Sequence, residues 1–197
     1  MDQPSDRILF FRNGPQGEFQ PRETDTDPFS RDNTEKVMAF HQSLPEYQPT
    51  PLVSLESLAR HLDLSAIRVK DESFRFGLNA FKGLGASYAL YRALAEKLGL
   101  TEEPITLEHF RSPRMMQRVA ETVCITATDG NHGRAVAWIS RHIGCRAVVY
   151  MPRGSSRARL ENIRALGAEA SIIDGNYDDA VRMAAAKAET HGWILVQ

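Results

Sequence analysis

This chain of 197 residues lacks a dense set of cysteines, a long apolar run and an excess of charge of one sign. Its two cysteines cannot build the disulfide framework of a small secreted domain. No stretch approaches the roughly 18 consecutive apolar residues of a membrane-spanning helix, and the first residues lack the apolar run of a secretory signal. With 24 basic and 25 acidic residues, the chain also lacks the basic excess of nucleic-acid binders. We therefore expect a globular cytoplasmic protein without nucleic-acid or membrane partners.

Short apolar runs and helical patterns alternate in the second half of the chain. The runs cover residues 122–127, 147–150, 170–173 and 193–196, and the helical patterns between them cover residues 132–143, 156–166 and 177–190. Strands that alternate with helices of this length are typical of βαβ units and a parallel sheet. The sequence therefore predicts an α/β fold, an open parallel sheet of four strands with flanking helices.

The first half of the chain is less regular. The spacing of its apolar residues predicts helices at residues 33–42, 55–62 and 84–98, and extended segments at residues 50–53 and 66–70. Loops are expected at residues 72–80 and 101–121, the second with a helical turn at residues 107–110. These elements lead the chain toward the α/β region through the segment Phe81-Lys82-Gly83.

The most distinctive local segment is Thr126-Ala-Thr-Asp-Gly-Asn-His-Gly133, which follows a predicted strand and opens a predicted helix. Backbone N–H groups at the start of a helix favour negative ligand groups. Gly130 and Gly133 would allow tight turning and a close approach of the backbone to a ligand. Asp129 and Asn131 could equally cap the helix without any ligand. Both interpretations of this turn remain open at this point.

Lys82 occupies an unusual position between an apolar residue and a glycine, at the start of a predicted helix. A cation is disfavoured at the positive end of the helix dipole. This placement favours an uncharged amine, as a lysine that forms a Schiff base requires. The alternative is a surface lysine whose stem lies along apolar neighbours.

Together these two segments resemble the fold type II family of pyridoxal-phosphate enzymes, the tryptophan synthase β-like family. Further segments match that family in the same order along the chain. Lys70-Asp-Glu-Ser73 resembles its early Lys-x-Glu segment, Tyr150-Met-Pro152 resembles a strand end, and Gly167-Ala-Glu-Ala170 resembles the start of the next strand. Several matches in order are more specific than one motif.

The resemblance implies pyridoxal 5'-phosphate as the cofactor, bound covalently by Lys82. It implies that Asn131 contacts the hydroxyl of the cofactor ring, with Gly130 in the same turn. It also implies that residues 1–83 belong to the larger domain of such an enzyme and residues 84–197 form the smaller one, and that the full-length form is a homodimer acting on a small amino acid.

Two departures point to one branch of the family. Ala80 stands where dehydratases carry a serine, and Asp129 stands where they carry a hydroxyl residue. In both respects the chain resembles the diaminopropionate ammonia-lyase branch. This resemblance implies α,β-elimination from 2,3-diaminopropionate to pyruvate and ammonia, with Asp129 as a catalytic residue that accepts the α-proton. A carboxylate beside the substrate would also attract its second ammonium group.

Other interpretations stay open. The sequence ends in a buried-strand pattern at residues 193–197, and the glycine-rich loop that holds the cofactor phosphate in this family does not occur. We therefore expect a truncated enzyme that is weak or inactive alone. The alternatives are a threonine or serine dehydratase-like enzyme of the same fold, and a non-catalytic truncated α/β module.

Three residues receive a structural interpretation. His132 is expected to bond the backbone, as loop histidines often do. Cys124 and Cys145 are expected to be buried thiols that behave as small apolar side chains. Because neither cysteine pairs with a histidine or a second cysteine at metal-ligand spacing, we predict no metal site.

Overall fold

The computed structural model describes residues 30–100 and 106–197, and the prediction for residues 101–105 lies outside these ranges. A four-stranded sheet with the order β5-β4-β3-β6 forms the centre of the second half. Its strands are β3 (Val123–Ala127), β4 (Arg146–Met151), β5 (Glu169–Ile172) and β6 (Ile194–Leu195). Every neighbouring pair in this sheet is parallel. The predicted α/β sheet of four parallel strands is confirmed.

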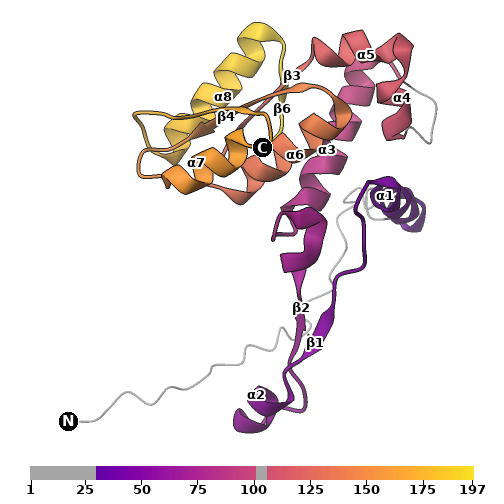
Figure 1. Cartoon of the computed structure of the whole chain (residues 1–197), viewed down its shortest axis with the longest axis vertical. Coiled ribbons are helices and arrows are strands. Elements are labelled where there is room, and N and C mark those ends of the chain that lie inside the picture. Colours follow the sequence, from indigo (N-terminus) through magenta and orange to yellow (C-terminus); the bar gives the residue numbers. More distant parts are fainter. Residues whose placement is uncertain (1–29, 101–105) are drawn as a thin grey trace, which may run out of the picture.

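Helices cover both faces of this sheet (Figure 1). On one face, α6 (Asn131–Ile143) and α7 (Arg157–Arg164) pack over β4 and β5. On the other face, α8 (Tyr177–His191) packs over β3 and β4. The alanines of α8 that face the sheet recur every fourth residue and are Ala180, Ala184 and Ala188. Because alanine side chains are small, the helix lies close to the sheet.

A second layer of helices packs against the outer side of α6. It consists of α3 (Lys82–Leu98), α4 (Leu107–Arg111) and α5 (Pro113–Ala120), with α1 (Arg31–Ser43) against α3. Their common core is fully buried around Leu90, Phe110 and Ile139. This core holds the start of α3, and therefore Lys82, beside the sheet domain.

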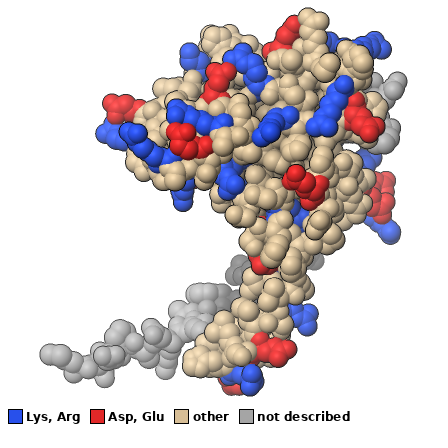
Figure 2. Space-filling model, in the orientation of Figure 1, with Lys and Arg blue, Asp and Glu red and all other residues tan. Residues whose placement is uncertain are grey.

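A narrow projection extends away from this packed part of the molecule (Figure 1). We name residues 50–70 the arm; it contains β1 (Leu52–Ser54), α2 (Glu56–His61) and β2 (Arg68–Lys70). β1 and β2 pair antiparallel, with Val53 opposite Val69. The face of the arm that Figure 2 shows carries few charged side chains between its tip and its base.

Two predicted loops are partly helical. Residues 113–120 form α5, because Met115 and Val119 lie one turn apart and are buried against the core, with Pro113 in the first turn. Only these two residues form the buried face, and Met116 beside them is exposed, so the sequence shows no clear helical pattern here. Within the predicted loop 72–80, η2 (Glu72–Gly77) consists of short 3₁₀ turns interrupted by a kink at Arg75 and Phe76. None of the described helices has the length and apolar character needed to cross a membrane.

Candidate active site

The strand order creates a switch point between β3 and β6. From β3 the chain moves outward through β4 to β5, and it then returns to place β6 on the opposite side of β3. In open parallel sheets, ligands bind outside the carboxyl ends of the strands at such a point. Residues 128–131 follow the carboxyl end of β3 directly. The topology therefore places the distinctive turn of the sequence at the expected ligand crevice.

The turn is held together by Thr128. Its buried hydroxyl oxygen accepts hydrogen bonds from the backbone N–H groups of Gly130 (3.0 Å) and Gly133 (3.2 Å). The N-cap residue of α6 is Gly130. Neither Asp129 nor Asn131 caps the helix, so the interpretation that needs no ligand is wrong for these two side chains. Both are exposed.

Glycine is required at position 133 by close packing. A Cβ atom there would lie 2.4 Å from Cγ2 of Thr128 and 2.9 Å from Cγ1 of Val149. Gly130 is less crowded, and a Cβ atom there would lie 3.3 Å from Cδ of Arg159. The Nη1 atom of Arg159 donates to the Asp129 carbonyl oxygen at 3.0 Å. The turn thus has a fixed backbone from which the side chains of residues 129 and 131 project.

The end of β6 lies on the other side of the switch point from β4. Nε2 of His132 donates to the Val196 carbonyl oxygen at 2.9 Å, which confirms that this histidine bonds the backbone. The Gln197 side-chain oxygen accepts from the Ala127 N–H at 3.2 Å. These contacts tie the start of α6 to the strand on the far side of the switch point.

Lys82 is the first residue of α3, and its side chain is exposed. The segment before it contains two residues in the left-handed backbone region, Phe76 (φ 51°) and Asn79 (φ 55°). Such conformations cost free energy in residues other than glycine and persist only where surrounding contacts hold them. The Phe76 ring is one such contact, since it stacks on Trp138 of α6 at a centroid distance of 4.6 Å.

A hydrogen bond joins the lysine segment to the start of α6. Nη1 of Arg134 donates to the Leu78 carbonyl oxygen at 3.0 Å. Arg134 lies in the first turn of α6, which begins with Asn131. On the other side, Nε2 of His41 donates to the Leu84 carbonyl oxygen at 2.9 Å, and burial lowers the pKa of this histidine. The segments that carry Lys82 and Asn131 are therefore held against each other.

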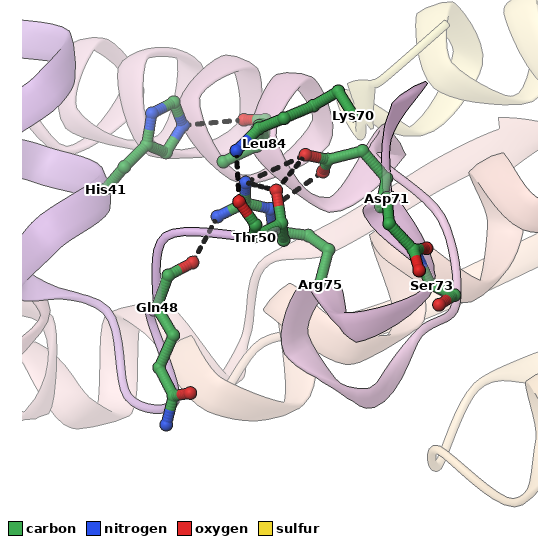
Figure 3. A network of polar contacts seen from close by, with 9 residues as sticks. His41, Gln48, Thr50, Lys70, Asp71, Ser73, Arg75 and Leu84 are labelled. Carbon is green, nitrogen blue, oxygen red and sulfur yellow. Dashed lines mark hydrogen bonds and ion pairs between the residues drawn. The ribbon is translucent and has the colours of Figure 1, made fainter. Parts of the chain in front are cut away.

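A buried ion pair supports the lysine segment from the base of the arm (Figure 3). Nε of Arg75 lies 2.8 Å from a Glu72 carboxylate oxygen. Its other nitrogens donate to the Gln48 carbonyl oxygen at 2.9 Å and to the Thr50 hydroxyl at 3.1 Å. The hydrogen bond from Arg75 lowers the pKa of Glu72 to about 2. Lys70 also donates to the Thr50 carbonyl oxygen.

The sequence did not reveal this cluster, although Lys70 and Glu72 belong to a segment that resembles the family. Arg75 contacts Gln48 and Thr50 across more than twenty residues of sequence. The spacing of three residues between Glu72 and Arg75 is a signal for an ion pair, but it does not indicate burial. The role of the cluster is to position the segment before Lys82.

The three predicted functional side chains have one property in common. Within the described residues, the side-chain polar atoms of Lys82, Asp129 and Asn131 make no hydrogen bond or ion pair, whereas the surrounding polar groups are largely paired. An amine, an amide and a carboxylate on two segments that a hydrogen bond joins suit a ligand with an aldehyde, a ring hydroxyl and a bound amino acid. These side chains therefore fit the cofactor that the sequence implies. The structure also contains no group of three or more metal-ligating side chains in residues 30–100 and 106–197.

Known proteins resemble this chain over most of its length. The profile of the family described as "Pyridoxal-phosphate dependent enzyme" matches residues 44–197. Diaminopropionate ammonia-lyase of Salmonella typhimurium is 52% identical over 162 residues, which make up 82% of this chain and 40% of that protein. Biosynthetic L-threonine dehydratase of the same organism is 32% identical over 149 residues, or 76% of this chain and 24% of that protein.

A solved structure gives the same picture. The crystal structure of Escherichia coli diaminopropionate ammonia-lyase in apo form superposes with a TM-score of 0.78 at 45% identity. The match covers 86% of this chain and 45% of that one. The chain thus spans less than half the length of the ammonia-lyases that it matches.

Proposed function

The chain belongs to the pyridoxal-phosphate dependent enzyme family, and from this premise we propose that the whole protein is an ammonia-lyase. Its substrate would be 2,3-diaminopropionate, which with one water molecule yields pyruvate and two molecules of ammonia. The observation that carries the proposal is the set of unpartnered side chains formed by Asp129 and Asn131 at the switch point and by Lys82 on the segment bonded to the start of α6. The similarity to diaminopropionate ammonia-lyases supports the choice of substrate.

Each proposed site residue has a separate role in binding the cofactor or in the reaction. The amine of Lys82 holds the cofactor, and the amide of Asn131 orients its ring, with Gly130 bringing the backbone close. Pyridoxal phosphate, when bound, supplies an electron sink for the carbanion that forms at the substrate α-carbon. The carboxylate of Asp129 accepts the α-proton and attracts the β-ammonium group. Arg159 holds the Asp129 backbone and so keeps that carboxylate at the crevice.

The dehydratase alternative has less support. A dehydratase removes a hydroxyl group from the β-carbon and gains nothing from a carboxylate that attracts an ammonium group. The threonine dehydratase relative is also less similar, at 32% identity against 52% for the ammonia-lyase. The third interpretation, a non-catalytic module, has its basis in the short match to the relatives.

One substrate panel separates the three functions. The 197-residue chain, and a form extended to the length of the relatives, are loaded with pyridoxal phosphate and given 2,3-diaminopropionate, L-threonine or L-serine. Ammonia and the oxo acid are then measured. We expect the extended form to prefer diaminopropionate and the short chain to be weak or inactive. Preference for threonine or serine would support the dehydratase, and an inactive extended form that binds no cofactor would support the non-catalytic module.

We also propose that the whole protein is a cytoplasmic homodimer in which the arm belongs to the larger domain and residues 84–197 form the smaller one. Two free cysteines are compatible with a reducing compartment. The exposed apolar side chains of the arm, such as Leu52 and Val69, are the kind of surface that further protein usually covers. Sedimentation of the extended form at several concentrations tests the dimer.

A further inference from the structure

The only two cysteines of the chain meet inside the protein. Cys124 lies in β3, and Cys145 lies directly before β4. Their sulfur atoms are 3.5 Å apart, and both residues are buried. Because β4 is parallel to β3 and Cys145 precedes it, the pair lies toward the amino ends of the strands. It is therefore separate from the crevice at the carboxyl ends.

A cavity of about 340 Å³ reaches one member of this pair. Cys145 lines it together with Ser140 and Arg141 of α6 and with Arg164 and Gly167 near the end of α7. Cys124 is absent from the lining of this cavity. A small polar molecule in the cavity would thus meet Cys145 first.

Ser140 makes the cavity suitable for binding a small polar molecule. Its carbonyl oxygen accepts a hydrogen bond from the Cys145 thiol at 3.7 Å. Its hydroxyl oxygen is buried and makes no close hydrogen bond within the described residues, although it weakly favours the thiolate of each cysteine. A buried hydroxyl with only weak sulfur contacts is costly unless a bound molecule satisfies it. This hydroxyl and the two arginines could hold a small oxygen-bearing molecule near the thiol.

The two thiols differ in acidity as well as in access. A hydrogen bond between them stabilises the thiolate of Cys145, which lowers the pKa of Cys145 and raises that of Cys124. The thiolate is the nucleophilic form of cysteine.

We propose that Cys145 and Cys124 form a peroxide-reactive dithiol, with Cys145 as the attacking residue and Cys124 as the resolving one. The Cys145 thiolate attacks one oxygen of a hydroperoxide such as hydrogen peroxide, the O–O bond breaks, and hydroxide leaves. Cys145 becomes a sulfenic acid. The Cys124 sulfur then attacks the Cys145 sulfur and expels water, so that a disulfide forms. The dithiol loses two electrons, and hydrogen peroxide is reduced to two molecules of water.

The geometry suits this sequence of steps. Sensor cysteines are typically acidic, next to a resolving cysteine and open to the oxidant; Cys145 is buried, and the cavity that it lines is the route by which a small hydroperoxide would reach it. The sulfur atoms here need to approach by only about 1.5 Å to reach the S–S bond length of about 2.05 Å. The proposal does not depend on pyridoxal phosphate or on the lyase activity. An experiment can therefore overturn the dithiol proposal without affecting the proposed function, and the reverse.

Mass spectrometry of the unmodified chain tests the proposal directly. The reduced 197-residue chain is treated with hydrogen peroxide, quenched and measured intact, and its free thiols are counted. We expect loss of both thiols, a mass decrease of two hydrogen atoms, a peptide that links Cys124 to Cys145, and recovery with dithiothreitol. Addition of oxygen atoms without a link, a disulfide between two chains, or two surviving thiols would overturn it.

Single variants then identify the attacking residue. With Cys124→Ala, we expect a dimedone-type reagent to trap the sulfenic acid on Cys145. With Cys145→Ala, we expect Cys124 to be labelled at least about tenfold more slowly in the folded protein. Circular dichroism verifies folding, and labelling in urea should make the two variants equal, because only the fold distinguishes the thiols. Equal labelling rates without urea would contradict the assignment.

Discussion

Two regions of this protein contain strands with apolar residues, but the strand residues are buried in one region and exposed to solvent in the other. In the central strand β3 all five residues are buried, whereas in β1 and β2 of the arm all six residues are exposed. Ile125 of β3 has no exposed surface, while Leu52 of β1 is 61% exposed and Val69 of β2 is 44% exposed. Apolar character alone therefore does not decide burial in this chain. Burial depends on whether helices cover both faces of a strand.

The candidate site lies where these two regions meet. The turn with Asp129 and Asn131 is held by the packed region, through Thr128 and β6. Lys82 follows the base of the arm, where Arg75 and Glu72 pair. We therefore expect changes in the packed region to affect stability in the isolated chain. Changes at the arm and at Lys82 should have their main effect on the function of the whole protein.

The largest effect is expected for Lys82→Ala in the extended, cofactor-loaded form. Loss of the covalent anchor should lower ammonia release by more than about 10³-fold. It should also remove the cofactor absorbance that survives gel filtration, and leave the melting temperature of the apo protein nearly unchanged because Lys82 is exposed. The exposed lysine of α8 gives the control, and Lys187→Ala should keep full activity. A Lys82→Ala protein that retains covalent cofactor would remove this residue from its proposed role.

Asp129→Asn should have the next largest effect. Removal of a proton acceptor typically lowers a rate by about 10²–10⁴-fold. Cofactor binding should persist, because the backbone of the turn is held by Thr128 and Arg159 and not by the carboxylate. The substitution Asp178→Asn at an exposed position of α8 should leave kcat unchanged. Full activity of Asp129→Asn with both enantiomers of the substrate would exclude the proposed role.

The difference in burial between the two regions can be tested by shortening one similar apolar side chain to alanine in each and comparing the loss in unfolding free energy. Ile125→Ala in β3 should lower the unfolding free energy of the chain by about 2–5 kcal/mol, because it leaves a cavity under α8. Leu58→Ala in the arm removes a similar side chain that is 43% exposed, and it should cost less than about 0.5 kcal/mol. Urea unfolding measures both. Equal costs would mean that the arm is buried in solution.

A crowded glycine of the turn, Gly133, can be compared with an uncrowded glycine of α3, Gly85. Gly133→Ala would force a Cβ atom against Thr128 and Val149, and overpacking of this kind costs about 1–3 kcal/mol. Gly85→Ala in α3 meets no atom within 4 Å, and it should stabilise the helix by about 0.4–1 kcal/mol. Thermal unfolding should therefore shift in opposite directions. A neutral Gly133→Ala variant would show that the turn can relax.

Much of the packed region was predictable from the sequence, since parallel strands with both faces covered are nearly continuous apolar runs. The capping box formed by Asn176 and Asp179 likewise indicates from nearby residues alone where α8 begins. The helix α5 was missed because its buried face consists of only two residues. At the site, Lys82 and Asn131 were predictable because each stands in a short motif. Arg159 was not, because its contact with Asp129 spans 30 residues of sequence.

The left-handed conformations of Phe76 and Asn79 could not be predicted either. Asparagine adopts a positive φ more often than most residues other than glycine, but nothing in the local sequence favours one at Phe76. Tertiary contacts with Trp138 and Arg134 support this segment instead. Sequence patterns therefore gave the candidate chemical groups, and long-range packing determined the backbone conformation of the segment before Lys82.

The smallest expected effect concerns the ion pair at the base of the arm. The pKa of Glu72 is lowered from 4.5 to about 2, first by the hydrogen bond from Arg75. A carboxylate with a lowered pKa stabilises the fold above the unfolded value, and this stabilisation is lost as pH falls from about 4.5 toward 2. Because solvent screens the partly exposed carboxylate, Glu72→Gln should lower the melting temperature at pH 7 by only about 2–4 °C.

Melting curves from pH 7 down to pH 2.5 make this prediction specific. The difference between the unmodified chain and Glu72→Gln should shrink as the carboxylate of Glu72 becomes protonated, because the two side chains are then both neutral. Glu96→Gln on the exposed side of α3 should run parallel to the unmodified chain over the same range. If the difference for Glu72→Gln stays constant with pH, the carboxylate does not stabilise the base of the arm through its charge. The lysine segment would then be positioned mainly by the packing of Phe76 on Trp138.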